Sequence, residues 1–327
     1  MKAARLRAVR DWEFVDVDQP VPGAGQMRVR LEQVAVCGSD LPEFLGVHPG
    51  FPKAAGGTGH EAIGRVDSCP SGSYAEGERV LLWGFDRVHG LFQEAVLTHD
   101  QGLLRLPSDE VPERVLLTQL LGTVIRPFRK LGNVINQRAV ILGQGPAGLL
   151  FTAVLRNLGA RDIVAVEPLD WRREFASRMG ATHTIDPAAV DPVEAVGEIT
   201  GGAMADLVVE AVGGAETYAA AAGLCRRGGT VIGFGVPDKQ VSGGVLDLPL
   251  LEMQRREINL VMTLNAGDQP YDDYANALAW IEEGRLDLSG LVSHVLPFAE
   301  IQRAFELAAD RPAPERPAKI VLSFEAP

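Results

Sequence analysis

The chain has 327 residues, 46% of them hydrophobic and 23% charged, which is typical of a globular protein long enough for two domains with separate cores. Acidic residues outnumber basic ones by 43 to 31 and no run of Lys or Arg occurs, so neither a nucleic acid nor an anionic membrane is an expected partner. No apolar run reaches the length of a membrane span, the N-terminal segment lacks the apolar core of a signal peptide, and three cysteines are too few and too scattered for a disulfide framework, so we expect a cytoplasmic protein.

The first part of the chain, to about residue 120, has the pattern of a β-rich domain. The stretch M-R-V-R-L-E-Q-V-A-V alternates and is rich in Val, and E-R-V-L-L-W is a second short apolar strand. Gly and Pro punctuate these runs often, as turns between strands require.

The pattern changes after Arg114. A helix is predicted from there, with a kink at Pro127, and is followed by the apolar strand 138–142, a glycine-rich turn, a helix over 149–158 and a second strand, I-V-A-V-E-P. Three further apolar runs, A-D-L-V-V-E-A-V-G, G-G-T-V-I-G-F-G-V and I-N-L-V-M-T-L-N, alternate with helices. Such runs suit a parallel sheet covered on both faces, which is the α/β doubly wound architecture.

The glycine-rich turn G-Q-G-P-A-G has the spacing of a dinucleotide-binding site. Gly143 permits the tight turn, Gly145 lets the backbone approach a pyrophosphate, and Gly148 lets helix and strand pack closely. Pro146 and Ala147 are expected cofactor-binding residues of the same turn, and the N-terminus of the following helix offers N–H groups and a partial positive charge to the phosphates. A glycine turn without a ligand is the alternative interpretation.

Glu167 ends the next strand, 19 residues after Gly148. Its carboxylate is expected to accept hydrogen bonds from the adenosine ribose and to repel a 2′-phosphate, which favours NAD(H) over NADP(H). Arg172, another expected cofactor-binding residue, and Arg173 lie close enough to weaken that preference.

Three residues earlier in the chain have the chemistry of a zinc site. Cys37 lies in C-G-S-D, and His60 and Glu61 lie in G-H-E-A-I-G. Thiolate, imidazole and carboxylate are the ligands that zinc takes in proteins.

With G-E-R-V at 77–80, the glycine turn and a late L-V-S-H-V-L-P-F, these motifs resemble the zinc-dependent medium-chain dehydrogenase/reductase family along nearly the whole chain. The resemblance implies a β-rich, GroES-like catalytic domain over 1–122 and 266–327, a Rossmann domain over 123–265, and an active site in the cleft between them. It also implies an NAD(P)-dependent alcohol dehydrogenase.

The resemblance assigns roles near the metal. Cys37 and His60 correspond to catalytic zinc ligands, and Glu61 to a carboxylate that lies behind the metal or joins it transiently. Ser39 corresponds to the hydroxyl that takes the proton of the alcohol. Asp40 corresponds to the carboxylate that orients the zinc-bound histidine.

The resemblance also assigns two roles near the cofactor. Thr123 corresponds to the residue that packs against the nicotinamide ring, and Lys319 to the basic residue near the pyrophosphate.

Two departures from the family pattern matter. No cysteine lies between Val80 and Gly90, so we expect one catalytic zinc and no structural zinc. Gln119 stands where a third zinc ligand, Cys, Asp or Glu, is usual. Whether Gln119 or Glu61 completes the site stays open, and Gln119 as a helix residue without metal contact is a further alternative. A Cys–His–Gln set leaves zinc with one positive charge, which makes it a stronger Lewis acid but holds it less tightly.

We therefore expect hydride transfer between NAD(H) and a secondary alcohol or ketone. Gln119 and the loop Trp83-Gly84-Phe85 favour a polyol, sugar or cyclitol as substrate. A zinc-free enone or quinone reductase and a non-catalytic nucleotide-binding protein are the alternatives. Family members commonly form homodimers or homotetramers through a sheet edge, for which I-N-L-V-M-T-L is a candidate.

Overall fold

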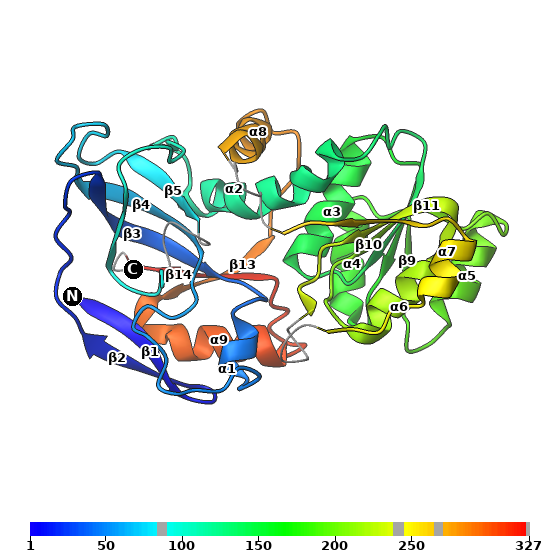
Figure 1. Cartoon of the computed structure of the whole chain (residues 1–327), viewed down its shortest axis with the longest axis horizontal. Coiled ribbons are helices and arrows are strands. Elements are labelled where there is room, and N and C mark those ends of the chain that lie inside the picture. The colour runs from blue at the N-terminus through cyan, green and yellow to red at the C-terminus, as the bar shows by residue number, and fades with distance from the viewer. Residues whose placement is uncertain (84–89, 238–244, 265–270, 325–327) are drawn as a thin grey trace. The chain divides into compact units, whose positions relative to one another are not determined.

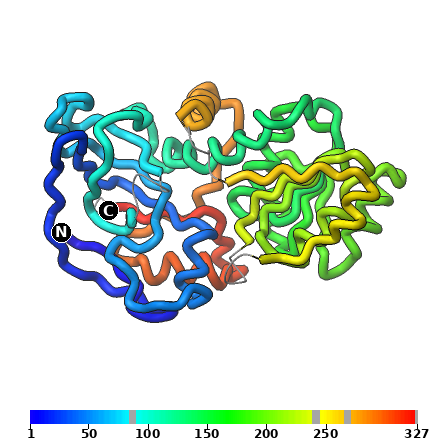
Figure 2. The backbone as a smooth tube through the Cα atoms, in the orientation of Figure 1, coloured from blue at the N-terminus to red at the C-terminus, as the bar shows by residue number. Residues whose placement is uncertain are grey.

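The computed structural model describes residues 1–83, 90–237, 245–264 and 271–324, which form two compact units. The first unit contains Met1–Leu120, Tyr274–Glu282 and Leu288–Pro327, and the second contains Leu121–Asp273 and Glu283–Asp287. Figure 2 traces the backbone of each unit. The domain limits 1–122 with 266–327 and 123–265 stay a prediction, and the limit at 265 lies outside the described residues.

The first unit is built on mainly antiparallel sheets, in which only the β13–β14 pairing among those described is parallel (Figure 1). Its elements are β1 (Lys2–Ala8), β2 (Asp11–Asp16), β3 (Gln26–Val36), α1 (Leu41–Phe44), β4 (Glu61–Ser68), β5 (Arg79–Trp83), β6 (Ala95–His99), most of α2 (Pro112–Ile125) and α8 (Tyr271–Glu282), β13 (Val292–Pro297), a 3-10 turn (Phe298–Glu300), α9 (Ile301–Asp310) and β14 (Lys319–Ser323). The main sheet has the order β13-β14-β3-β4-β5, with β6 also paired to β3. This is the GroES-like part of the fold.

Strand β3 shows why this sheet forms. Its first residues alternate between buried and less buried positions, and from Glu32 to Val36 every side chain is buried. That half of the strand pairs with β4 on one side and β14 on the other, so its run of Val and Ala fills the centre of the sheet.

The second unit is a parallel α/β domain. Its elements are a 3-10 turn (Arg126–Arg129), β7 (Arg138–Leu142), α3 (Pro146–Asn157), β8 (Asp162–Val166), α4 (Asp170–Met179), β9 (His183–Ile185), α5 (Pro192–Thr200), β10 (Ala205–Glu210), α6 (Ala215–Leu224), β11 (Cys225–Gly233), α7 (Leu250–Arg255) and β12 (Asn259–Met262). All pairings in the sheet β12-β11-β10-β7-β8-β9 are parallel. The doubly wound Rossmann architecture expected from the sequence is confirmed.

The winding direction reverses beside β7. The chain runs outward through β8 and β9 and then crosses to β10 on the other side of β7. Because such crossovers are right-handed, α3 and α4 cover one face and α5 and α6 the other. Val196 of α5 and Leu224 of α6 accordingly pack in one buried cluster with Val140, Val164 and Val208 of the strands.

The kink predicted at Pro127 is a change of helix type. Helix α2 ends at Ile125, and residues 126–129 continue as a 3-10 turn with Pro127 in its first positions. Proline lacks the N–H that would continue the α-helical ladder, and the tighter turn avoids that requirement. Strand β9 is too short and too exposed for the sequence pattern to have predicted it.

Candidate active site

Three chain segments meet where strands β14, β3 and β4, neighbours in the main sheet of the first unit, begin or end. Strand β3 ends at Val36, and its antiparallel partner β4 begins at Glu61, with Val34 opposite Ala62. Strand β14 begins at Lys319 and places Ile320 opposite Val36. The pairing register therefore gathers Cys37, the start of β4 and Lys319, although up to 282 positions separate them in the sequence.

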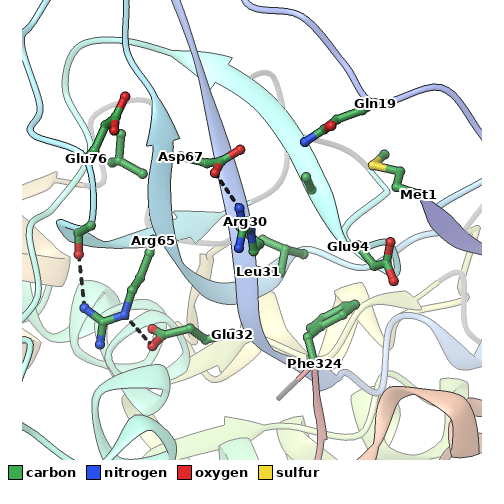
Figure 3. Close-up of a pocket in the computed structure, with 13 residues that line it drawn as sticks. Met1, Gln19, Arg30, Leu31, Glu32, Arg65, Asp67, Glu76, Glu94 and Phe324 are labelled. Carbon is green, nitrogen blue, oxygen red and sulfur yellow. Dashed lines mark hydrogen bonds and ion pairs between the residues drawn. The ribbon is translucent and has the colours of Figure 1, made fainter. Parts of the chain in front are cut away.

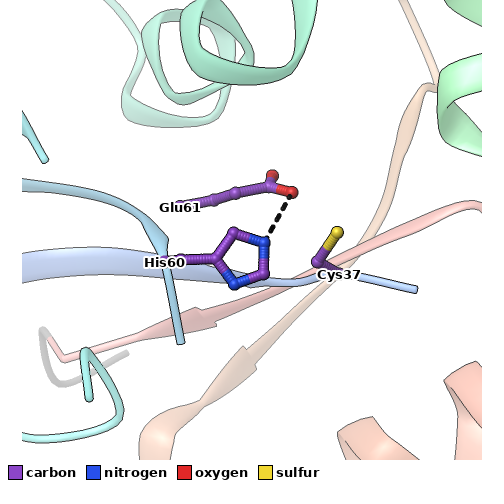
Figure 4. Close-up of side chains that lie close together, drawn as sticks. All are labelled: Cys37, His60 and Glu61. Carbon is purple, nitrogen blue, oxygen red and sulfur yellow. Dashed lines mark ion pairs between the residues drawn. The ribbon is translucent and has the colours of Figure 1, made fainter. Parts of the chain in front are cut away.

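Cys37, His60 and Glu61 form a compact cluster. One ligand atom from each of these residues lies within 4.8 Å of the other two, and Figure 4 shows the carboxylate and the thiol on the same side of the imidazole. His60 and Glu61 are buried, and Cys37 is partly exposed. Within the part of the chain that the structure describes, this is the one group of three or more His, Cys, Asp or Glu side chains close enough to hold a metal ion.

The imidazole of His60 is held in one orientation. Its Nδ1 lies 3.0 Å from the carbonyl oxygen of Thr58, which can only accept, so Nδ1 carries the proton. The same nitrogen lies 3.3 Å from Oδ1 of Asp40. Nε2 is therefore the nitrogen left to bind a metal ion in place of a proton, and it lies 3.2 Å from the Ser39 hydroxyl. This is the arrangement by which proteins fix a metal-binding histidine.

The carboxylate of Asp40 is itself held in place by hydrogen bonds. Its carboxylate accepts hydrogen bonds from the Thr58 hydroxyl at 2.7 Å and from the backbone N–H of Cys37 at 2.8 Å, and its side chain is fully buried. Asp40 thus joins the two segments that carry the cluster.

The electrostatics of the cluster favour a positive charge in it. Burial acts to lower the pKa of His60, but the charges of Asp40 and Cys37 outweigh burial and raise it well above its ordinary value. Burial likewise acts to raise the pKa of Asp40, yet the interaction with His60 and the hydrogen bonds lower it. A site that stabilises a proton on a buried imidazole between anionic groups is also suited to a cation.

Glu61 has a second partner. Its Oε2 lies 2.5 Å from the ammonium of Lys319, and both side chains are at most 3% exposed. Burial acts to lower the pKa of Lys319, but Glu61 and then Cys37 raise it, so the side chain stays charged. The expected role of Lys319 near the pyrophosphate stays a prediction, and its contact with Glu61 was not foreseen because it depends on the β3–β14 pairing.

Gln119 lies buried in α2, in the same unit as the cluster. Its side-chain oxygen Oε1 has no hydrogen-bond partner within the described ranges. A buried amide oxygen without a partner is costly, which indicates that a group absent here completes it.

The glycine turn lies where β7 ends and α3 begins. Gly143 has a φ of +86°, which favours glycine. A Cβ on Gly148 would lie 2.0 Å from the carbonyl oxygen of Gly143, so the turn and the helix touch backbone to backbone. Helix α3 starts at Pro146 with Gly145 as its extended N-cap, which leaves the N–H groups of its first turn facing the end of β7.

Glu167 supports this turn directly. Its carboxylate accepts hydrogen bonds from the backbone N–H of Gln144 at 2.7 Å and of Leu169 at 3.1 Å, and the side chain is 4% exposed. Arg172 is buried, and its guanidinium nitrogen would lie 4.0 Å from a Cβ on Gly145. Arg173 is held by the carbonyl oxygens of Glu167 and Pro168 and faces Asp186.

Comparison with known proteins assigns the chain. The family model of the alcohol dehydrogenase GroES-like domain matches residues 23–108, and that of the zinc-binding dehydrogenase matches residues 146–283. The chain belongs to the zinc-type medium-chain dehydrogenase/reductase family. The resemblance inferred from C-G-S-D, G-H-E-A-I-G and G-Q-G-P-A-G is therefore confirmed.

Whole-length relatives agree with this assignment. L-threonine 3-dehydrogenase of Thermococcus kodakarensis is 25% identical over 90% of this chain and 91% of its own length. Alcohol dehydrogenase of Cupriavidus necator is 26% identical over 90% and 92%. The structure of alcohol dehydrogenase TADH from Thermus sp. ATN1 matches 99% of this chain and all of its own with a TM-score of 0.88 at 25% identity. This member of the family is an oxidoreductase, and its membership supports a zinc and a nicotinamide cofactor.

One described cavity of this dehydrogenase lies apart from the cluster. A cavity of about 790 Å³ lies along β3 and β4 in the first unit, and none of Cys37, His60 or Glu61 lines it (Figure 3). Both arginines that line it are paired with carboxylates of the same wall, with Arg30 2.6 Å from Asp67 and Arg65 2.9 Å from Glu32. The cavity therefore indicates no ligand class.

The structure leaves two other expectations untested, the role of Thr123 and that of the loop Trp83-Gly84-Phe85. Thr123 is buried in α2, and its expected contact with the nicotinamide stays a prediction. Trp83 ends β5, whereas Gly84 and Phe85 of the expected substrate loop lie outside the described residues. No helix among the described residues is long and apolar enough to cross a membrane.

Proposed function

We propose that this protein catalyses reversible oxidation of a secondary alcohol to a ketone, with zinc in the Cys37–His60 site and NAD(H) on the Gly143–Gly148 turn. The observation that carries the proposal is the convergence of a ligand atom each from Cys37, His60 and Glu61 within 4.8 Å of one another, in a chain that also has the glycine turn. When bound, the metal supplies a Lewis acid for the substrate oxygen, and the nicotinamide supplies the hydride acceptor.

Each residue around the metal has a task of its own. Cys37 and His60 bind the ion, and Asp40 with the Thr58 carbonyl keeps the imidazole in the tautomer that can bind. The Ser39 hydroxyl, 3.2 Å from Nε2, is the group within reach to take the proton of an alcohol that approaches the ion. In many members of the family that the chain resembles, a histidine near the position of Pro42 extends the proton relay, so Ser39 would here pass the proton to water or to the cofactor ribose.

We propose Gln119, rather than Glu61, as the third protein ligand. Glu61 is neutralised by Lys319 at 2.5 Å, which weakens it as a donor to a cation. Gln119 Oε1 is a buried oxygen without a partner and is chemically suited to zinc as a neutral ligand. The resulting set carries a single anionic ligand and is expected to lose its metal to chelators easily. Dialysis against EDTA tests this, because retention of a full equivalent of zinc would contradict the Gln119 assignment.

We propose NAD(H) as the preferred cofactor. Glu167 presents a buried carboxylate at the end of β8, where the adenosine ribose is expected, and a 2′-phosphate there would meet like charge. Arg173, which could offset this, is occupied by two carbonyl oxygens and Asp186. Arg172 beside Gly145 is better placed for the pyrophosphate than for the 2′-position.

A panel of alcohols and ketones, assayed with NAD(H) and NADP(H) in both directions, tests the reaction and the cofactor together. Turnover of polyols, sugars or cyclitols is expected. Full activity of a Cys37→Ala variant on enones or quinones would instead favour a zinc-free reductase, and cofactor binding without turnover would favour a nucleotide-binding protein.

We further propose a homodimer or homotetramer that associates through β12. This strand pairs only with β11 in the described sheet, and its Leu260 and Met262 are 37% and 49% exposed. Light scattering after size exclusion gives the mass, and charged substitutions at both positions should reduce it to that of one chain.

A further inference from the structure

A buried carboxylate in the second unit has no role in the proposed chemistry. Glu210 is the last residue of β10 and is completely buried. A buried carboxylate is expensive unless hydrogen bonds satisfy it, so its partners indicate what it does.

The side chain of Glu210 shapes the loop that follows β10. Its Oε1 accepts hydrogen bonds from the backbone N–H groups of Val212 and Gly213, both at 2.9 Å, and from the Thr217 hydroxyl at 2.7 Å. The carboxylate thus ties the loop between β10 and α6 to the first turn of that helix.

The same residue holds the loop that follows β11. The carbonyl oxygen of Glu210 accepts the N–H groups of Phe234 at 3.0 Å and Gly235 at 2.9 Å. Tyr218, which is 5% exposed, donates its hydroxyl to the carbonyl of Gly235 at 2.7 Å. Burial and the charge of Glu210 raise the pKa of Tyr218, so this hydroxyl remains a donor at all neutral pH values.

The two loops interlock closely around this carboxylate. A Cβ on Gly235 would lie 2.2 Å from the backbone nitrogen of Gly213 and 2.4 Å from Glu210 Oε2. A Cβ on Gly213 would lie 2.3 Å from the carbonyl oxygen of Val236. Side chains at either glycine would push the loops apart, so the packing specifies their shape.

The position of these loops points to a ligand. The strand order reverses between β7 and β10, and a dinucleotide binds across the carboxyl ends of the strands at such a reversal. Glu167 at the end of β8 marks the adenosine side, so the loops after β10 and β11 lie on the nicotinamide side. A Cβ on Gly143 would lie 2.6 Å from Val212 Cγ2, which makes the Glu210 loop a direct neighbour of the glycine turn.

We propose that Glu210 is a positioning residue for the nicotinamide half of the cofactor, holding the loops after β10 and β11 in the shape that receives the nicotinamide and its ribose. The inference rests on the proposed dinucleotide function. Glu167 and Glu210 would then act in the same way on the two halves of the cofactor site. Glu167 accepts the backbone N–H of Gln144 on the adenosine side, and Glu210 accepts those of Val212 and Gly213 on the nicotinamide side.

The test compares a ligand that contains nicotinamide with one that lacks it. Titration calorimetry with NADH and with ADP-ribose gives both affinities for the wild type, Glu210→Gln and Glu167→Gln. For Glu210→Gln, NADH is expected to bind about tenfold more weakly while ADP-ribose changes by less than about twofold, since only charged hydrogen bonds on one side are weakened. Glu167→Gln should weaken both ligands. Retained ADP-ribose binding also shows that the Glu210→Gln domain is folded.

Tyr218→Phe provides an independent reading if Glu210→Gln does not fold. It removes one hydrogen bond to Gly235 without changing charge, and a loss of about threefold for NADH alone is expected. Equal losses for NADH and ADP-ribose, or no loss for NADH, in either variant would overturn the inference. Failure of the wild type to bind either ligand would instead contradict the proposed function itself.

Discussion

The Cys37–His60–Glu61 cluster takes its polar atoms from side chains of two separate segments, whereas the glycine turn takes its polar atoms from backbone N–H groups of one short segment. In the cluster, Asp40 and Lys319 each position a charged or ligating neighbour. At the turn, side chains such as Glu167 act behind the backbone and hold it in shape. A substitution in the cluster should therefore remove chemistry while the fold survives, and a substitution at the turn should disturb both.

Removal of the thiolate should break the cluster most completely. Cys37→Ala leaves His60, the neutral Gln119 and a Glu61 already paired with Lys319, too little to retain zinc under the proposed assignment. We expect loss of bound metal and a fall in kcat/KM of about 10³-fold or more, because the group that stabilises charge on the substrate oxygen is gone. Metal analysis and steady-state kinetics measure both.

The matched control for this variant is Cys69→Ala, which removes a thiol outside the cluster. It should keep its metal, its activity and its melting temperature. A metal-depleted but fully active Cys37→Ala enzyme would show that the cluster does not serve the reaction.

An added methyl group should break the glycine turn. In Gly148→Ala the new Cβ would lie 2.0 Å from the Gly143 carbonyl oxygen, and backbone cannot yield as a flexible side chain does. We expect the affinity for NADH to fall by about 100-fold and the free energy of unfolding by about 2–3 kcal/mol, from opening of the turn. Calorimetric titration and denaturant unfolding give the two values.

Gly197→Ala is the control for a glycine in the same unit. It lies inside α5, where the nearest atom to a new Cβ is Met204 Sδ at 3.9 Å, so a gain of about 0.5–1 kcal/mol in stability is expected. Unchanged NADH binding in Gly148→Ala would mean that the turn does not hold the cofactor.

This contrast also explains what the sequence could predict. The glycine turn, the strand before it and Glu167 lie within 30 residues, and each has a local physical requirement that leaves a pattern. Cys37 and His60 could be paired only through the family resemblance. The Lys319–Glu61 contact left no sequence pattern, because it depends on strand register. The packing of two loops around Glu210 left none either, because these loops meet only in the folded sheet. Strand β9 was missed because tertiary pairing, rather than its own sequence, makes it a strand.

Loss of the ammonium of Lys319 should show whether this residue weakens metal binding in the cluster. In Lys319→Met, Glu61 becomes a buried carboxylate without its cation, which destabilises the metal-free protein but improves Glu61 as a ligand. We expect metal to dissociate about tenfold more slowly into a chelator and to raise the melting temperature more than it does in the wild type. Absorption of the cobalt-substituted protein reports whether the ligand set has changed.

Lys319→Arg keeps the charge and should behave as the wild type in the same chelator assay. If Lys319→Met lost metal faster than the wild type, the ammonium would be supporting the site rather than competing with the ion for Glu61.

The smallest expected effect concerns the other end of strands β7, β10 and β11, where side chains add to the backbone pairing of the strands. Asp206 in β10 accepts hydrogen bonds from Arg138 in β7 and Arg226 in β11. Burial acts to raise its pKa, but these hydrogen bonds outweigh burial and lower the pKa to about 2. Because the folded pKa lies below the unfolded value of about 3.9, the stabilisation is complete above that value and is lost as the pH falls toward 2.

Asp206→Asn should therefore lower the free energy of unfolding by about 1 kcal/mol at pH 7, after allowance for solvent screening, and the difference from the wild type should shrink between pH 4 and pH 2. Asp162→Asn, which breaks the more exposed pair with Arg161, should cost less at every pH. Urea unfolding of the three proteins across this range measures the differences, and a cost for Asp206→Asn that stayed constant down to pH 2 would mean that its charge does not join the strands.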